Sequence, residues 1–387
     1  MKYRNLLIIS NNFPDKKDEY VGAIFVKEQV KFLTNFFDNV YVISPVAYGV
    51  ELLRKTQHED YSINKMHVYF PKYFNFPLFF FYFRDVWLRL EFFAISNFIR
   101  KTDLKFDLIH AHFTWPSGAV AAYLKKEFKV PLVITEHTSN TFRRAIEKKD
   151  PLFIRAWAES DIIIRVRRDD IPLFSDVGIS LDKICYLPNG YDSSSFSTLD
   201  LEQSRKKLGL PLDKKILLNV GNLYSEVKGH RYLIEAIGKV VKKRTDVLCV
   251  IVGSGKLRNK LEAQIKEAGL EDYVQLVGGK PHTEIPLWIN SCDLFVLPSL
   301  NEGNPTVLFE CLGSGKPFVG TSVGGIPEII VSDDYGLLVE PKNSNKLAKV
   351  ILFALDRKWN RDKIIDYSIQ FSWEKIATKI VSIYNTV

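Results

Sequence analysis

Short apolar runs alternate with amphipathic segments along this chain of 387 residues. Amphipathic segments with a helical period, such as residues 25–36, separate the runs. A parallel strand can be reached from its neighbour only through a crossover connection, so this alternation predicts parallel sheets covered by helices on both faces. The fold class is therefore expected to be α/β. The strand-like runs are residues 6–10, 40–44, 108–111, 131–135 and 162–164, and then 216–220, 247–252, 273–277 and 294–297.

The alternation is interrupted once, by a polar, serine-rich stretch that carries a short charged helical pattern. We place a linker there, over residues 192–212, between a first domain over 1–191 and a second over 213–370. A chain of this length suits two domains of ordinary size. The second half repeats the architecture of the first without repeating its sequence. We therefore expect two Rossmann-like domains.

Composition excludes several classes of protein. The net charge is +8, and it is shared evenly: residues 1–195 hold 27 Lys and Arg against 23 Asp and Glu, and the remainder holds 26 against 22. Neither half is a basic arm, so nucleic acid is not an expected partner. The N-terminal apolar run is too short for a signal peptide, and no stretch approaches the ~20 apolar residues of a spanning helix. The four cysteines form no C-x-x-C pair, which is typical of a reduced, cytoplasmic protein.

The sequence EGNPTVLFE at residues 302–310 carries the strongest chemical signal. It follows a buried strand, so it lies where open α/β sheets bind ligands. We expect Asn304 to be the N-cap of a helix and Pro305 its first residue, which leaves free N–H groups ready for an anion. Glu302 lies in the loop, and Glu310 lies on the helix, where it could accept hydrogen bonds from a sugar diol. This arrangement predicts a site for a nucleotide-sugar.

With this segment, the chain resembles the retaining glycosyltransferases of family four, whose E-x7-E motif matches Glu302 and Glu310. The resemblance spans roughly residues 5–340 and implies the GT-B architecture, in which two Rossmann-like parallel-sheet domains face each other across a cleft. It also implies that a last helix, within residues 371–387, packs back on the first domain. Other motifs match in order: GAIFVKE at 22–28, DLIHAH at 107–112, TEH at 135–137, PNGYD at 188–192, VGN at 220–222 with KG at 228–229, VGSG at 252–255, GSGKP at 313–317 and GGIPE at 324–328.

The resemblance implies transfer of a sugar from a nucleoside diphosphate to a cell-surface glycan or lipid-linked acceptor. His137 is then expected near the donor sugar, Lys228 on the diphosphate, and Glu302 on the sugar. The absence of a convincing D-x-D element and the helix N-terminus together imply a metal-free reaction without a cofactor. Two alternatives remain, a nucleotide-sugar epimerase of the same architecture and an inactive scaffold subunit. The expected donor-binding residues are Gly22, Asn222, Gly253, Lys280, Gly303, Asn304, Pro305, Thr306 and Glu310.

The chain departs from the family's pattern at two places. Asn222 stands where an arginine commonly forms a two-cation clamp with the lysine. Either Lys228, as the main cation, and the helix N-termini suffice, or another basic group such as Arg231 helps. Three arginines, Arg165, Arg167 and Arg168, occupy a place where small polar residues are usual. They form either a salt-bridged surface with the two following aspartates or a site for an acceptor phosphate.

Residues 70–98 are unusually aromatic, with 10 of the 27 phenylalanines. Arginines interleave with the aromatic residues, which suits a helix at a membrane interface. The alternative is a core helix with a loop packed under it. We expect the segment to bind anionic membrane surfaces, which would make the protein peripheral at the inner face of the membrane.

Overall fold

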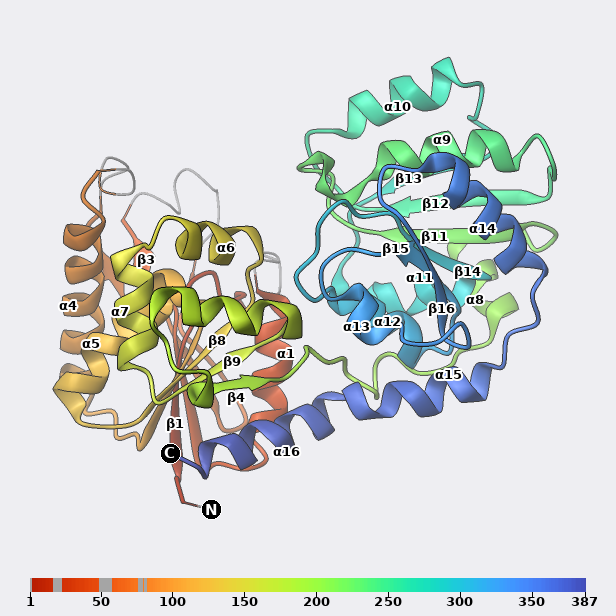
Figure 1. The fold of residues 1–387 in the computed structure, drawn as a ribbon. Coiled ribbons are helices and arrows are strands. Elements are labelled where there is room, and N and C mark those ends of the chain that lie inside the picture. Colours follow the sequence, from red (N-terminus) through yellow and green to blue (C-terminus); the bar gives the residue numbers. More distant parts are fainter. Residues whose placement is uncertain (1, 17–22, 49–57, 76–78, 80–81) are drawn as a thin grey trace. The chain divides into compact units, whose positions relative to one another are not determined.

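The computed structural model describes residues 2–16, 23–48, 58–75, 79 and 82–387 (Figure 1). The chain forms two compact units. The first consists of Met1–Pro188 and Trp373–Val387, and the second of Asn189–Ser372.

The first unit is built on an eight-stranded sheet with the order β10-β9-β8-β7-β1-β2-β5-β4. All of its pairs are parallel except β4 with β5. A separate parallel pair joins β3 (Val46–Ala47) to β6 (Lys72–Tyr73). The sheet strands are β1 (Asn5–Ile9), β2 (Asn39–Ile43), β4 (Tyr61–Ile63), β5 (Met66–Tyr69), β7 (Leu108–His112), β8 (Leu132–Glu136), β9 (Ile162–Arg165) and β10 (Ile184–Tyr186). The helices are α1 (Ile24–Leu33), α4 (Arg84–Thr102), α5 (Ala119–Phe128), α6 (Asn140–Glu147), α7 (Pro151–Glu159) and α16 (Trp373–Tyr384).

Alternate residues of β1 serve two different cores, because successive side chains on a strand point to opposite faces. Leu6 and Ile8 pack with α1 and α16, whereas Leu7 and Ile9 pack with α4, α5 and α7. The strand is therefore apolar throughout, as expected for a parallel sheet that is buried on both faces. The last helix, α16, belongs to this unit and packs against α1.

The second unit holds a six-stranded, fully parallel sheet with the order β13-β12-β11-β14-β15-β16. Ile216 and Leu218 of β11 face the core under α11 and α12, and Leu217 faces the core under α9 and α14. The strands are β11 (Lys215–Val220), β12 (Val247–Val252), β13 (Val274–Gly278), β14 (Leu294–Leu297), β15 (Phe318–Thr321) and β16 (Gly336–Val339). The helices are α8 (Leu201–Leu208), α9 (His230–Val240), α10 (Arg258–Glu267), α11 (Ile285–Ser291), α12 (Thr306–Gly313), α13 (Ile326–Ile329), α14 (Ser344–Asp356) and α15 (Arg361–Ser368).

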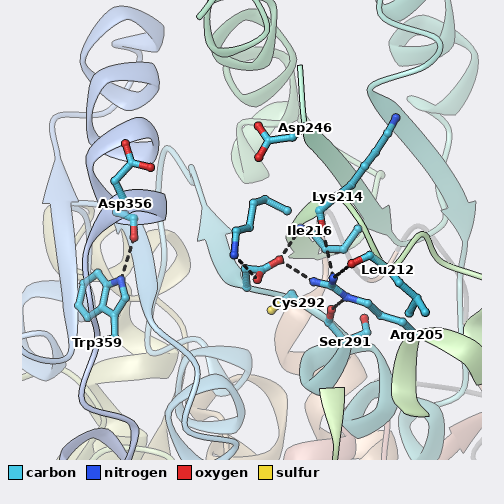
Figure 2. A network of polar contacts seen from close by, with 12 residues as sticks. Arg205, Leu212, Lys214, Ile216, Asp246, Ser291, Cys292, Asp356 and Trp359 are labelled. Atoms are coloured by element: carbon cyan, nitrogen blue, oxygen red, sulfur yellow. Dashed lines mark hydrogen bonds and ion pairs between the residues drawn. The ribbon is translucent and has the colours of Figure 1, made fainter. Parts of the chain in front are cut away.

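Residues 192–212, which the sequence suggests are a linker, are an integral part of the second unit. Arg205 on α8 is 3% exposed, and its guanidinium donates to the Ser291 carbonyl at 2.9 Å and to Asp293 at 2.5 Å (Figure 2). Asp293 also accepts the backbone N–H of Ile216 at 2.7 Å. A buried guanidinium needs such partners, so α8 is held against the start of the sheet. The serine-rich composition of the stretch did not predict that Arg205 would be buried.

Candidate functional site

The loops after β11, β12, β14 and β15 meet at the carboxyl edge of the second sheet, and glycines let their backbones touch. A Cβ on Gly229 would lie 1.9 Å from the Pro298 carbonyl oxygen, and one on Gly324 would lie 1.9 Å from that of Glu302. A Cβ on Gly253 would likewise lie 1.9 Å from the Gly221 carbonyl oxygen. Gly253 was expected to bind a donor, and the structure gives it this packing role between two loops. The edge is therefore a set of loops locked to one another rather than independent segments.

Lys228 and Glu302 come together at this edge. The Lys228 ammonium lies 2.8 Å from Glu302 Oε1, and the Ser299 hydroxyl donates to the same oxygen at 2.6 Å. The Glu302 side chain is 8% exposed and that of Lys228 is 22% exposed. Such a shielded ion pair is held in one geometry by its hydrogen bonds. A bound anion would have to compete with Glu302 for the lysine.

The start of α12 differs from the sequence expectation. The helix begins at Thr306, with Pro305 in an extended conformation before it, and no side chain in the described part of the protein caps it. Asn304 instead receives the Asn189 backbone N–H on its Oδ1 at 2.7 Å, while its carbonyl accepts the Asn189 amide at 2.8 Å. Asn304 is therefore not an N-cap, because a distant backbone donor uses the oxygen that capping would need. The first turn of α12 keeps uncapped N–H groups beside Gly303, as an anion site requires.

Glu310 lies on α12 and contacts a residue that the sequence analysis did not assign. The His282 Nε2 lies 3.1 Å from Glu310 Oε1, and the carboxylate is 8% exposed. The ring of Phe196 lies 5.4 Å from that of His282. Lys280, expected to touch the donor, places its ammonium 5.5 Å from the centre of the Trp288 ring. Nothing in the local sequence pattern around His282 signals its contact with Glu310.

Asn222 brings no charge to this edge of the sheet. Its Oδ1 accepts the backbone N–H of Tyr224 at 3.3 Å, so the amide is used to shape its own loop. Gly22, another expected donor contact, lies outside the described residues.

In the first unit, three histidines gather at the ends of β7 and β8. His112 Nδ1 lies 3.0 Å from His137 Nε2, and their rings are stacked 5.3 Å apart. His110 lies two residues before His112 on the strand, and their ring centres are 4.3 Å apart. His110 also bonds Thr135 at 2.7 Å and Tyr384 of α16 at 2.6 Å. Burial lowers the pKa of His110 to about 3, and burial together with the neighbouring histidines lowers the pKa of His112 well below its usual value. Both rings are therefore neutral at pH 7.

Arginines at and beyond the end of β9 take part in a buried salt-bridge network. Arg165 is fully buried and lies 2.5 Å from Asp170, which Arg143 also binds at 2.8 Å. Arg165 further donates to the carbonyls of Glu136 and Thr138 at 2.6 and 2.7 Å. It thereby fixes the turn that carries His137. Of the two interpretations of this cluster, the contacts favour the salt-bridged one.

In the part of the chain that the structure describes, no three His, Cys, Asp or Glu side chains gather as a metal site would need. None of the described helices is both long and apolar enough to cross a membrane.

Two family models match the chain, one for each half. The model described as Glycosyltransferase Family 4 matches residues 22–195, and that described as Glycosyl transferases group 1 matches residues 200–371. The putative teichuronic acid biosynthesis glycosyltransferase TuaC of Bacillus subtilis is 29% identical, over 99% of this chain and 98% of its own length. A D-inositol 3-phosphate glycosyltransferase of Corynebacterium aurimucosum is 28% identical over 75% of this chain and 74% of its own length.

Solved structures share the fold. Sucrose-phosphate synthase from Thermosynechococcus elongatus superposes with a TM-score of 0.79 at 19% identity, covering 99% of this chain and 98% of its own. HepE of Anabaena, in complex with UDP, superposes with a TM-score of 0.77 at 19% identity, covering 99% of this chain and 100% of its own. A further structure of HepE contains UDP-glucose.

Proposed function

Because the chain belongs to the GT-B glycosyltransferases of family 4 and group 1, we propose that it is a retaining enzyme that uses a nucleoside-diphosphate-sugar. The acceptor is a hydroxyl of a cell-surface glycan or of a lipid-linked sugar. The observation that carries this proposal is the joint position of Lys228, Glu302 and the uncapped start of α12, at the carboxyl edge of the second sheet. The complex of HepE with UDP-glucose supports a donor of this class.

The donor diphosphate binds the first-turn N–H groups of α12 and the ammonium of Lys228. Sugar transfer leaves negative charge on this diphosphate, and fixed donors that are already oriented stabilise such charge without reorganisation. Glu302 holds the lysine in place before the donor binds, and then accepts a hydroxyl of the donor sugar. Glu310 accepts the ribose hydroxyls, with His282 fixing the orientation of its carboxylate.

His137 lies close to the reacting sugar in this proposal. Its ring is held by His112, which is neutral and fully buried. The leaving phosphate helps to remove the proton of the acceptor hydroxyl as the new bond forms on the same face of the sugar. The product therefore keeps the anomeric configuration of the donor.

Thermal-shift screening with UDP, GDP and ADP tests donor binding, since a ligand that binds the folded state raises its melting temperature. We expect one nucleotide to raise Tm, and its sugar conjugates to support transfer to a glycan acceptor. The anomeric proton coupling in the product then reports retention. Donor interconversion without any acceptor would instead support the epimerase, and the lack of a shift with every nucleotide would support the scaffold.

The proposed reaction needs no divalent metal, because Lys228 and the α12 amides supply the positive charge that the leaving group requires. Transfer should be unchanged in excess EDTA. A loss of activity that Mg²⁺ or Mn²⁺ restores would contradict this.

We also propose that α4 binds an anionic membrane surface. Its inner face is core, with Leu88 and Ile95 fully buried. Its outer face exposes Val86, Arg89 and Phe93 one helical turn apart, and Tyr82 at its start is 75% exposed. Aromatic side chains and an arginine on one exposed stripe suit the interface of an anionic bilayer.

Co-sedimentation with vesicles tests this surface. We expect binding to vesicles that contain phosphatidylserine, and weaker binding to neutral ones. A variant with Tyr82→Ser, Val86→Ser and Phe93→Ser should lose it. A matched variant of exposed apolar residues in the second unit, Val331→Ser and Phe353→Ser, should bind as the unmodified protein does. Equal binding by both variants would contradict the proposal.

A further inference from the structure

His230 is the first residue of α9, and hydrogen bonding within the fold does not explain why a histidine is buried there. It directly follows Lys228 and Gly229, and only 2% of its surface is exposed. Neither of its ring nitrogens has a hydrogen-bond partner among the described residues. A neutral imidazole always carries one N–H, and a buried donor without an acceptor costs about 1–3 kcal/mol. An apolar residue of similar size would avoid this cost.

The Nε2 atom of His230 borders a small space over Gly221. A Cβ built on Gly221 would lie 3.8 Å from His230 Nε2 and 3.7 Å from Cγ and Cδ of Lys228, at ordinary contact distances. The backbone of Gly221 is not left-handed, so its conformation does not require glycine. The absent side chain instead leaves room between the lysine stem and the imidazole. This space lies in the same loop system as the Lys228–Glu302 pair.

The charged groups of this loop indicate which kind of ligand group would occupy the space. Asn222 carries no charge and its Oδ1 accepts a hydrogen bond within its own loop. Lys228, the main cation expected on the diphosphate, is already paired with Glu302. A diphosphate carries several acceptor oxygens, and hydrogen bonds to charged acceptors are the stronger ones. An N–H donor beside the lysine would satisfy one such oxygen and relieve its own burial at the same time.

We propose that His230 donates its Nε2–H to the diphosphate of the nucleotide, as a second donor in place of the missing arginine. This rests on the proposed donor site and adds a binding residue to it. The charged groups that act on the ring are Lys228 and Glu226. Burial, and then Lys228, lowers the pKa of His230 to about 4, so it is a neutral donor at pH 7.

Calorimetric titration of two variants tests the inference. His230→Phe keeps a ring of similar volume without an N–H, and His230→Gln keeps a donor near the position of Nε2. We expect His230→Phe to weaken binding of the nucleoside diphosphate found by thermal shift by roughly ten- to a hundredfold, the scale of a hydrogen bond to a charged group. Binding of the matching nucleoside, which has no phosphate, should not change. His230→Gln should recover part of the loss. Unchanged diphosphate affinity in His230→Phe overturns the inference.

A second measurement reads the effect in the unmodified protein, and a variant serves only to assign the signal. In the unmodified protein with isotope-labelled histidine, saturating pyrophosphate should raise the pKa of His230, because the anion favours the charged imidazole. His230→Gln identifies the resonance. A His230 signal that pyrophosphate leaves unmoved overturns the inference. The proposed function itself would fail in a different way: the unmodified protein would bind none of UDP, GDP and ADP.

Discussion

At the residue scale, Lys228 and Glu302 act as one unit. Their charged groups lie 2.8 Å apart, and Ser299 holds the carboxylate in place. Their pairing keeps a cation at the sheet edge when no donor is present. In the proposed donor complex, one ion pair of Lys228 would replace another, and no free lysine side chain would have to be ordered.

Lys228→Ala should therefore lower kcat/KM by ~10²-fold or more, the scale typical for the loss of one donor to a developing oxyanion. Steady-state kinetics with the identified donor measures it. Lys266→Ala, an exposed lysine of α10, is the control and should have no effect. Turnover near that of the unmodified protein in Lys228→Ala would mean that other groups hold the phosphate.

Glu91 of α4 is a residue whose charge opposes folding. It is fully buried and accepts hydrogen bonds from Asn11 and from Trp87, each at 3.0 Å. Burial raises its pKa from 4.5 to about 7. The folded state therefore holds this proton more tightly than the unfolded state does. Its contribution to stability is complete below pH 4.5 and is lost as the pH rises through 7.

Glu91→Gln, which resembles the protonated form, should stabilise the protein at pH 8 by up to about 3 kcal/mol and change little at pH 4.5. Urea unfolding at the two pH values measures this difference. An equal change in the free energy of unfolding at both would show that Glu91 does not titrate as proposed.

At the scale of elements, the connections of the second unit depend on glycines for two different reasons. Gly229 and Gly269 both have a left-handed backbone, with φ of +69° and +63°. A Cβ on Gly229 would lie 1.9 Å from the Pro298 carbonyl oxygen, whereas one on Gly269 would meet no atom of the described residues within 4 Å. Substituting each glycine in turn therefore distinguishes the cost of backbone strain alone from the added cost of pushing two loops apart.

We expect Gly269→Ala to cost about 1 kcal/mol from backbone strain alone. Gly229→Ala should cost about 3 kcal/mol or more, because the loops after β11 and β14 must also separate. It should weaken nucleotide binding as well, since the Lys228–Glu302 contact joins these same two loops. Chemical denaturation and calorimetry measure both quantities. Equal losses of stability in the two variants would contradict the packing role.

At the scale of the whole molecule, the chain leaves the first unit at Pro188 and returns to it at Trp373. On its return, α16 buries Ile376, Ile380 and Tyr384 in the core shared with α1. The chain ends close to its beginning, because Lys2 and Tyr3 both donate to the Val387 carbonyl. The first unit is therefore complete only when the last helix has been made.

Ile380→Ala should destabilise the first unit by about 2–5 kcal/mol, as expected for a buried isoleucine. Hydrogen exchange should quicken in β1 and β7 and stay unchanged in β12 of the second unit. Lys379→Ala, on the exposed face of the same helix, is the matched control. Equal protection of β7 in both variants would contradict this role of α16.

The alternation of apolar and amphipathic segments was enough to predict the fold class and most strand positions. The run at residues 131–135, for example, is β8, Leu132–Glu136. Such patterns are readable because burial on both faces of a parallel sheet demands a continuous apolar run. The motifs likewise predicted the family, which the two family models confirm.

Contacts between residues distant in sequence could not be read in this way. Asparagine is a residue type that favours the N-cap. The Oδ1 of Asn304 nevertheless accepts the backbone N–H of Asn189, which lies 115 positions away in the sequence. The pairing of Lys228 with Glu302, of His282 with Glu310 and of His137 with His112 likewise joins separate segments. Local pattern reflects which face of an element is buried, whereas the partner of a polar group depends on which loops the fold brings to the same edge.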